Sequence, residues 1–348
     1  MTCPMSDVTR QTRRTSRRML LAALATVLVV AAWPAQAQDT VYYGEDFSRC
    51  TRLQGEVLDY NGQELVLSIL GGMERRFPSA GVLKIETKRT PQQEEGDRLF
   101  AQGKWQEALR AYMAAETQEP RAWVRRELMA QVVWCHHYLD QDHLAGEHFL
   151  ALLASDPKTP YFDCIPLAWI TREVTPALEA KAAQWLQNQN STAQLLGASH
   201  LLGTSQRAAA IEQLRHLRFD SDPRIAALAR CQLWRSQPVI NASTIGEWEK
   251  LLSSLPESLR AGPYFVLATA YSRQVQPEVA ALTYLKVPVL FPKERRLAAR
   301  ALAEAAQESV RLGREDDARL LRRELLQKYP DSAEATEAAR VLRSQGER

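Results

Sequence analysis

The chain has 348 residues, of which 44 are Lys or Arg and 41 are Asp or Glu, so its formal net charge is +3. Five arginines and one acid lie in residues 1–37, which therefore carry +4 and leave the rest of the chain near −1 (+3 minus +4). Binding to nucleic acid requires a strong basic surplus on one face, so this balance argues against nucleic acid as a partner.

Residues 1–37 are expected to form a cleaved export signal. The arginines precede an apolar run from Met19 to Trp33, and Ala35-Gln36-Ala37 then supplies the small-residue pattern of a cleavage site. A retained membrane anchor is the alternative, but this run is shorter than the roughly 20 residues that a spanning helix needs. Arg17-Arg18 also resembles the twin-arginine motif of bacteria. We therefore expect cleavage after Ala37 and export to the periplasm or cell envelope, by the Sec or the twin-arginine route.

Residues 38–90 are expected to form a small antiparallel β domain. Between Leu53 and Thr87 the pattern predicts four short strands, and apolar residues occupy every second position from Leu65 to Ile69. Asn61-Gly62 predicts a type I′ hairpin turn, and Gly71-Gly72 predicts a second turn. The pattern resembles small SH3-like or Sm-like barrels, which bind peptides or RNA. No aromatic groove or basic cluster accompanies it, so a structural cap on the following helices is the alternative interpretation.

Residues 91–160 contain one pattern written twice with an offset of 37 positions. A fixed period between 20 and 50 residues, with small, aromatic and proline residues in phase, is typical of stacked helical hairpins. Small residues let helix backbones approach each other, aromatic residues fill the gap, and proline ends the second helix. The recurring residues are Ala108, Tyr112 and Pro120, which return as Ala145, Phe149 and Pro157.

The pattern resembles the tetratricopeptide repeat family, on Gly96, Gly103 and the residues named above. The second unit departs from the family at its first helix, where Val133 and Asp140 replace the two glycines. The resemblance implies one pair of such hairpins at 91–160 and another at 259–330, followed by a capping helix in 331–348. The second pair rests on Tyr264, Ala268, Tyr271, Ala280, Tyr284 and Pro292, and then on Gly313, Ala318 and Pro330.

Residues 161–258 are expected to form a helical middle that resembles HEAT-type hairpins. Asp222-Pro223 predicts an N-cap residue followed by proline at the first helical position. The predicted fold is thus mostly α, an α-solenoid of hairpins with a small β domain before it, in a secreted protein of the bacterial envelope type. The helices expected in the middle are Ala177–Asn188, Thr192–Leu202, Gln206–Leu217 and Pro223–Trp234.

Residues with reactive chemistry form no recognised catalytic motif. The sequence has no G-x-S-x-G, no H-E-x-x-H and no phosphate-binding glycine loop, although a hydrolase with a carboxylate pair stays open. Four of six histidines lie between His136 and His148, but no two are spaced i, i+4, so packing or surface roles are favoured over a metal site. No cofactor is expected. Free thiols are favoured, with one disulfide left open, for Cys50, Cys135, Cys164 and Cys231.

The repeat pattern predicts a non-catalytic scaffold that binds a partner protein or peptide on a concave face. The peptide-binding members of the family hold a terminal carboxylate with a Lys and Asn clamp, which this sequence lacks. The alternative is a glycan-binding, accessory or hydrolytic role in the turnover of envelope polymers. Peripheral association with the envelope stays open, and a small-molecule ligand is not expected. The candidate partner-binding residues, by repeat phase, are Asp97, Phe100, Trp134, His137, Arg273 and Arg311.

Overall fold

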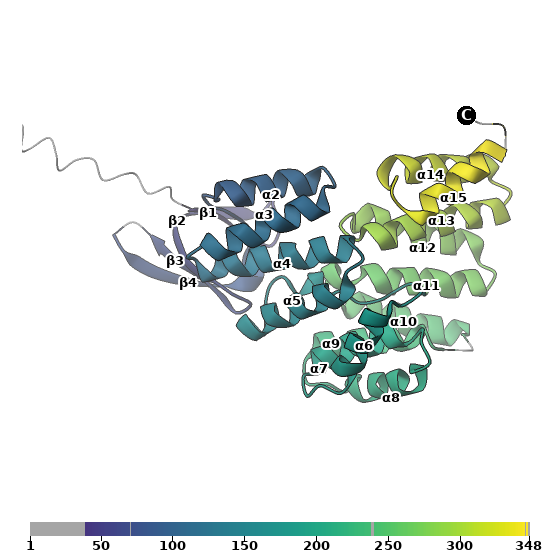
Figure 1. Cartoon of the computed structure of the whole chain (residues 1–348), viewed down its shortest axis with the longest axis horizontal. Coiled ribbons are helices and arrows are strands. Elements are labelled where there is room, and N and C mark those ends of the chain that lie inside the picture. The colour runs from purple at the N-terminus through teal and green to yellow at the C-terminus, as the bar shows by residue number, and fades with distance from the viewer. Residues whose placement is uncertain (1–38, 70, 238–239, 345, 347–348) are drawn as a thin grey trace, which may run out of the picture. The chain divides into compact units, whose positions relative to one another are not determined.

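The computed structural model describes residues 39–69, 71–237, 240–344 and 346. The chain divides into two compact units, Met1–Arg89 and Thr90–Arg348. In the described residues the first unit is a small antiparallel sheet and the second is helical, so the prediction of a mostly helical chain with a small N-terminal β region is confirmed (Figure 1). The expected export signal, residues 1–37, lies outside the described residues.

The described part of the first unit is a five-stranded antiparallel sheet in the order β4-β3-β2-β1-β5. Val41, Leu65 and Leu67 are fully buried in its core. Four strands were expected, and the additional one is β1, which pairs with both β2 and β5. Its sequence places Val41, Tyr42 and Tyr43 in succession, so apolar and polar residues do not alternate along it. The elements are β1 (Asp39–Gly44), β2 (Cys50–Tyr60), β3 (Glu64–Ile69), β4 (Met73–Pro78), the 3₁₀ turn η1 (Ser79–Gly81) and β5 (Val82–Glu86).

The two predicted hairpin turns have different outcomes. Gly71 and Gly72 have φ of 93° and 75° between β3 and β4, as a turn that needs positive φ requires. The prediction of a type I′ turn at Asn61-Gly62 is wrong, because the Asn61 N–H donates to Glu64 O at 3.0 Å, which leaves Gly62 and Gln63 at the centre, and Gln63 does not have the positive φ that a type I′ turn needs. Asn61 Oδ1 accepts the N–H groups of Gln63 and Glu64, the local bonding that favours Asn at turns.

Fourteen α-helices occupy the described part of the second unit, and most pack against their neighbours in sequence. None of these described helices is long and apolar enough to cross a lipid bilayer. The helices are α2 (Pro91–Ala101), α3 (Trp105–Gln118), α4 (Ala122–Tyr138), α5 (Asp142–Ser155), α6 (Pro176–Leu186), α7 (Ser191–Leu201), α8 (Arg207–Leu217), α9 (Pro223–Trp234), α10 (Ala242–Ser254), α11 (Ala261–Arg273), α12 (Pro277–Leu290), α13 (Arg295–Arg311), α14 (Glu315–Lys328) and α15 (Ala333–Ser344).

Four helical hairpins, α2–α3, α4–α5, α11–α12 and α13–α14, share one turn geometry. At the end of each first helix one residue has positive φ: Gly103 (74°), Asp140 (59°), Val275 (56°) and Gly313 (69°). In all four, the next N–H bonds the carbonyl five residues back, which is the pattern of a Schellman cap. The same backbone conformation therefore recurs with glycine, aspartate and valine at the turn position.

The repeated small and aromatic residues fill the inside of these hairpins. Five positions after each turn residue lies an alanine with no exposed surface. A Cβ at Gly96 would lie 2.7 Å from the Tyr112 ring, so the two helices meet closely there. Ala268 is fully buried at the corresponding place on α11. The buried alanines are Ala108, Ala145, Ala280 and Ala318, and the buried aromatic residues of the repeats are Tyr112, Phe149, Tyr271 and Tyr284, with Tyr264 partly buried.

Each second helix of the four hairpins ends in the same way. In each, the N–H of the C-cap residue donates to the carbonyl four residues back. The residue after the C-cap is a proline, which has no N–H to continue the helix. The residue before the proline is buried, and the proline itself is exposed. The prolines are Pro120, Pro157, Pro292 and Pro330.

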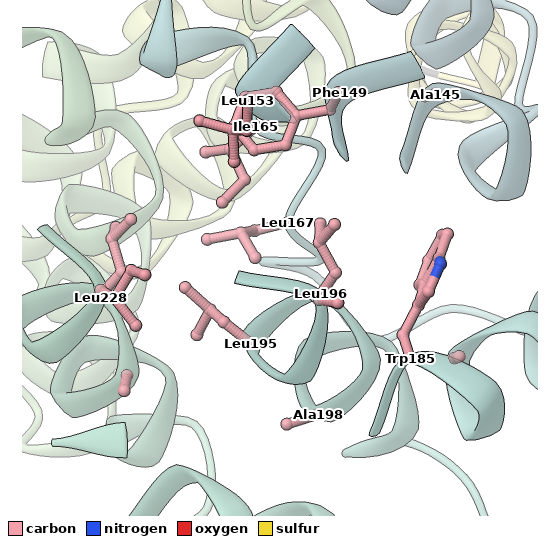
Figure 2. Close-up of a cluster of buried hydrophobic side chains, with 14 of the residues drawn as sticks. Ala145, Phe149, Leu153, Ile165, Leu167, Trp185, Leu195, Leu196, Ala198 and Leu228 are labelled. Carbon is pink, nitrogen blue, oxygen red and sulfur yellow. The ribbon is translucent and has the colours of Figure 1, made fainter. Parts of the chain in front are cut away.

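The middle helices, α6 to α9, begin and end within two residues of their expected bounds. Asp222 Oδ1 accepts the N–H of Arg224 at 2.9 Å, so Asp222 is the N-cap of α9 as predicted. A buried cluster joins these helices to α5 and to the chain that precedes α6. Figure 2 shows Ile165 and Leu167 of that chain between α5 and the Leu195 and Leu196 side chains of α7.

Candidate functional site

A non-helical connecting segment, residues 165–175, links the 3₁₀ turn η2 (Phe162–Cys164) to α6. Its backbone is held by side chains rather than by a sheet. Ala168 N–H donates to Ser199 Oγ at 2.8 Å, and Ala168 O accepts from Gln232 Nε2 at 3.0 Å and from Arg235 Nη1 at 2.7 Å. Helices α7 and α9 thus supply the hydrogen bonds that a buried backbone needs.

Two further contacts fix the same segment. His200 of α7, which is buried, places Nε2 2.9 Å from Pro166 O. Burial lowers the pKa of His200 to about 4, so it is neutral at pH 7 and donates this bond as an uncharged imidazole. The Trp169 ring lies against Gly262 of α11, where any Cβ would be 1.9 Å from the ring. Only glycine at this position lets the indole approach α11 so closely.

An ion cluster joins the α4–α5 turn, the connecting segment and α13. Arg172 Nη1 lies 2.7 Å from Asp140 Oδ1, and its Nη2 bonds Asp142. Arg296 of α13 lies 2.5 Å from Asp140 Oδ1 and 2.7 Å from Asp142 Oδ1. His137 Nδ1 lies 2.9 Å from Asp142 Oδ1. We call these five residues the closure cluster, because Arg296 connects helices that are more than 150 residues apart in sequence.

The charge state of the closure cluster follows from its burial. Burial, the charge of Arg296 and that of Arg172 lower the pKa of His137, although Asp142 opposes this, so the imidazole is neutral at pH 7. Burial alone would raise the pKa of Asp142, yet the pKa lies well below its ordinary value. Since His137 is neutral, we attribute this mainly to the hydrogen bond from His137 and to the guanidinium of Arg296. Asp142 is therefore ionised and doubly paired.

Glu294, the N-cap residue of α13, lies beside the closure cluster and has a different charge state. Burial raises its pKa to about 7, and Asp163 and Asp142 add to this while Arg296 opposes it. With this pKa the carboxyl group is half protonated near neutral pH, because its buried surroundings stabilise the charged form less than water does. The region around Arg296 therefore contains a firmly ionised carboxylate, that of Asp142, and another, that of Glu294, that titrates near neutrality.

A cavity of about 470 Å³ opens beside the connecting segment. Its aromatic lining comes from five elements: Trp169 of the segment, Trp234 of α9, Trp248 of α10, Phe265 of α11 and Tyr284 of α12. The rings of Trp234 and Trp248 stack with centroids 4.6 Å apart and an 8° angle between planes, and both side chains are buried. A cavity with such walls accepts a few side chains of a ligand.

Charged side chains also line this cavity, and they differ in how they are paired. Arg300 of α13 lies 2.6 Å from Glu304 and 3.9 Å from Glu334. Arg235 bonds only neutral oxygen atoms among the described residues, and Arg273 is exposed at the end of α11. The cavity therefore has an apolar wall and a lining with surplus positive charge.

The predicted partner-binding residues of the first hairpin contact other residues of the same unit. Asp97 is half-buried, and its Oδ1 accepts from Tyr112 Oη at 2.8 Å. The ring of Phe100 lies 5.0 Å from Trp105 and 5.5 Å from Tyr138, centroid to centroid. These two side chains therefore take part in packing at the place where a partner was expected.

The other four predicted residues divide between packing and the cavity. Trp134 is buried in the core of the middle helices, and His137 belongs to the closure cluster. Arg311 donates to Ser272 Oγ at 2.9 Å and to Glu308 at 2.8 Å. Arg273 is the one of the six that lines the 470 Å³ cavity.

The described cysteines and histidines do not form an arrangement that could hold a metal ion. Cys50, Cys135, Cys164 and Cys231 are free thiols, and burial raises the pKa of Cys135 to about 12. The rings of His136 and His148 stack 5.1 Å apart. Within the described ranges, no group of three or more His, Cys, Asp or Glu side chains is arranged to hold a metal ion.

Comparison with known proteins identifies no family for this chain. No protein-family model matches the chain, and no curated protein matches it. The geometry of the second unit is therefore the basis for a functional proposal.

Sequence reasoning did not find several residues that build this site. Arg172, Arg235 and Arg296 belong to no repeat position, and apart from Gln232, which is near Arg235 in sequence, their partners lie 30 to 159 residues away. Trp169 and Gly262 likewise gave no local signal, because neither residue type predicts a specific distant neighbour. A high tryptophan content, eight in the chain, is the one compositional hint of aromatic walls.

Proposed function

We propose that the protein is a non-catalytic scaffold, exported to the bacterial periplasm or cell envelope, that holds an extended segment of a partner protein. In this proposal the second unit is an α-solenoid with tetratricopeptide-like hairpins at both ends and a HEAT-like middle. Four hairpins with the same turn, the same buried alanine and the same terminal proline support this interpretation. For the first unit we propose an SH3- or Sm-like barrel, which its strand order and the turn η1 support.

The observation that carries the proposal is the cavity between the connecting segment and α9 to α13. Aromatic and arginine side chains in one lining are the composition that protein interfaces use for their strongest contacts. The inner positions of the first hairpins are already occupied by packing, through Phe100 and Trp134. We therefore place the partner at the cavity rather than along the whole series of inner helices.

A site-specific cross-linking experiment tests this placement. A photoreactive amino acid is placed at Thr171, an exposed residue of the connecting segment that lines the cavity. The matched control position is Arg230, which is exposed on α9 and lies outside this cavity. When the full chain is produced in bacterial cells and reaches their envelope, we expect a defined protein adduct from Thr171 and none from Arg230.

The adduct is then mapped to a peptide, and the purified partner is titrated against the wild type. Equal adducts from both positions, or none from Thr171, would contradict the placement. Adducts only with envelope glycans would instead support the role in polymer turnover.

A further inference from the structure

The charges that line the 470 Å³ cavity do not balance. Four arginines and two glutamates contribute to the lining, a surplus of two positive charges. Both glutamates lie near Arg300, at 2.6 and 3.9 Å. Arg172 is neutralised by the two aspartates of the closure cluster. Arg235 and Arg273 are therefore the two arginines of the lining that have no carboxylate partner among the described residues.

Arg235 is held in place by neutral groups. Its Nη1 donates to Ala168 O at 2.7 Å, Ser199 O at 3.0 Å and Gln232 Oε1 at 2.6 Å. No carboxylate pairs with it among the described residues, and no hydrogen bond of its Nε or Nη2 is found there. A guanidinium has five N–H donors, so this side chain is fixed by one edge and retains donors for a further acceptor. The residue is half-buried, and burial of the guanidinium lowers its pKa to about 10.

Arg273 provides a second cation at the same cavity. It is the last residue of α11 and is exposed, and it makes no hydrogen bond or ion pair with the described part of the chain. Its neighbour Ser272 is already engaged by Glu308 and Arg311, so those charges are used locally. Arg273 is therefore free to approach a ligand that enters beside Trp169 and Phe265.

We infer that the cavity recognises an acidic side chain, Asp or Glu, of the partner segment, next to an apolar residue that packs on the aromatic wall. This inference rests on the proposed function and names the chemistry of its ligand. The planar fork of arginine matches a carboxylate with two parallel hydrogen bonds, and such bonds are strong where water is excluded. Two unpaired arginines beside tryptophan and phenylalanine rings select for an acidic residue with an apolar neighbour.

Selection from a displayed library of random peptides tests the inference with the full-length protein. The four proteins compared are the wild type, Arg273→Glu, Thr171→Trp, which fills the cavity from an exposed position, and Arg230→Glu, which reverses a charge outside it. Circular dichroism checks that each variant is folded. The wild type should enrich peptides with Asp or Glu beside an aromatic or aliphatic residue.

Synthetic copies of the enriched peptides then give affinities. Arg273→Glu should weaken binding by about tenfold or more, since a charge-assisted hydrogen bond is replaced by repulsion, and Arg230→Glu should bind like the wild type. Selection on Arg273→Glu should enrich Lys or Arg where the wild type enriches acids.

The outcomes separate the two proposals. Enrichment of neutral or basic peptides that Thr171→Trp no longer binds would overturn the acidic preference and leave the peptide-binding function standing. If no enriched peptide is sensitive to Thr171→Trp, the cavity is not a peptide site and both proposals fail.

Discussion

Arg296 is the side chain that joins α13 to the α4–α5 turn. Its guanidinium contacts Asp140 and Asp142 and lies against His137. Asp142 is only 2% exposed, so it depends on its ion pairs for the stability of its charge. Loss of Arg296 leaves Arg172 as the single guanidinium beside a buried carboxylate.

Arg296→Ala should therefore lower the free energy of unfolding by about 2 to 4 kcal/mol, slightly less than the roughly 3 to 5 kcal/mol for removing one partner of a buried ion pair, because Arg172 still pairs with Asp142. The measurement is urea denaturation at pH 7, followed by circular dichroism. Arg314→Ala is the matched control, because Arg314 and Glu278 form an exposed pair at 3.0 Å that should contribute less than about 1 kcal/mol. Equal losses in the two variants would contradict the importance of the closure cluster.

Glu294 should make stability depend on pH in the opposite direction from Asp142. Its pKa is raised to about 7, so between its ordinary value and 7 the folded chain holds a proton that the unfolded chain has released. Stability from this group therefore falls as pH rises through that window. The pKa of Asp142 is lowered, so its contribution is present above its ordinary pKa and is lost only in acid.

Glu294→Gln should accordingly raise the free energy of unfolding by about 2 to 3 kcal/mol at pH 8 and change it little at pH 4. Denaturation curves at the two pH values measure this difference. Glu257→Gln, at an exposed position, should change neither curve. A Glu294→Gln gain that is the same at both pH values would show that ionisation is not its cause.

At the scale of elements, the four shared hairpin turns place different residues in one backbone conformation with positive φ. Val275 has φ of 56°, and a β-branched residue there is unfavourable, whereas Gly103 and Gly313 adopt the same geometry without strain. The Val275 side chain is 84% exposed, so its removal loses no packing. The α11–α12 turn is therefore a place where the sequence is not optimal for its backbone.

Val275→Gly should raise the free energy of unfolding by about 1 kcal/mol, because relief of strain outweighs the added freedom of the unfolded chain. Thermal unfolding of the full chain measures it. The reverse change, Gly103→Val, should destabilise by a similar amount. A destabilised Val275→Gly variant would mean that the positive φ at this turn is not strained.

Elements that depend on local pattern were predictable from the sequence. The helices α6 to α9 follow from breakers and caps such as Asp222-Pro223, and the turn at Gly71-Gly72 follows from residues that tolerate positive φ. Strand β1 was missed because Val41, Tyr42 and Tyr43 follow one another in it and give no alternation of apolar and polar residues. The turn at Asn61 shifted by one residue because the Asn61 side chain, rather than its backbone conformation, organises it.

The candidate site was largely not predictable. Of its residues only Arg273 and His137 were expected to have a role, and His137 was expected to face a partner rather than Asp142. The connecting segment has neither helical nor strand periodicity, so its path between helices is set by distant groups such as Ser199 and Arg235. Contacts between residues so far apart in sequence leave no local pattern.

At the scale of the whole molecule, the proposed export would decide which molecules surround the cavity. If residues 1–37 are a cleaved signal, the protein recovered from a bacterial periplasm should begin at Gln38, which mass spectrometry of the N-terminal peptide will show. Arg17→Lys combined with Arg18→Lys should block export if the twin-arginine route is used and leave it unchanged under Sec. Recovery of a chain that retains residues 1–37 in the cytoplasm would contradict the proposed location.

The central claim is that the cavity beside residues 165–175 holds a segment of a partner protein. Its most direct test is calorimetric titration of the segment identified by cross-linking into the wild type, Thr171→Trp and the matched variant Arg230→Trp, which adds the same side chain outside the cavity. We predict binding about tenfold or more weaker for Thr171→Trp, because the indole occupies the ligand's volume, and wild-type affinity for Arg230→Trp. Wild-type affinity in both variants would contradict the account.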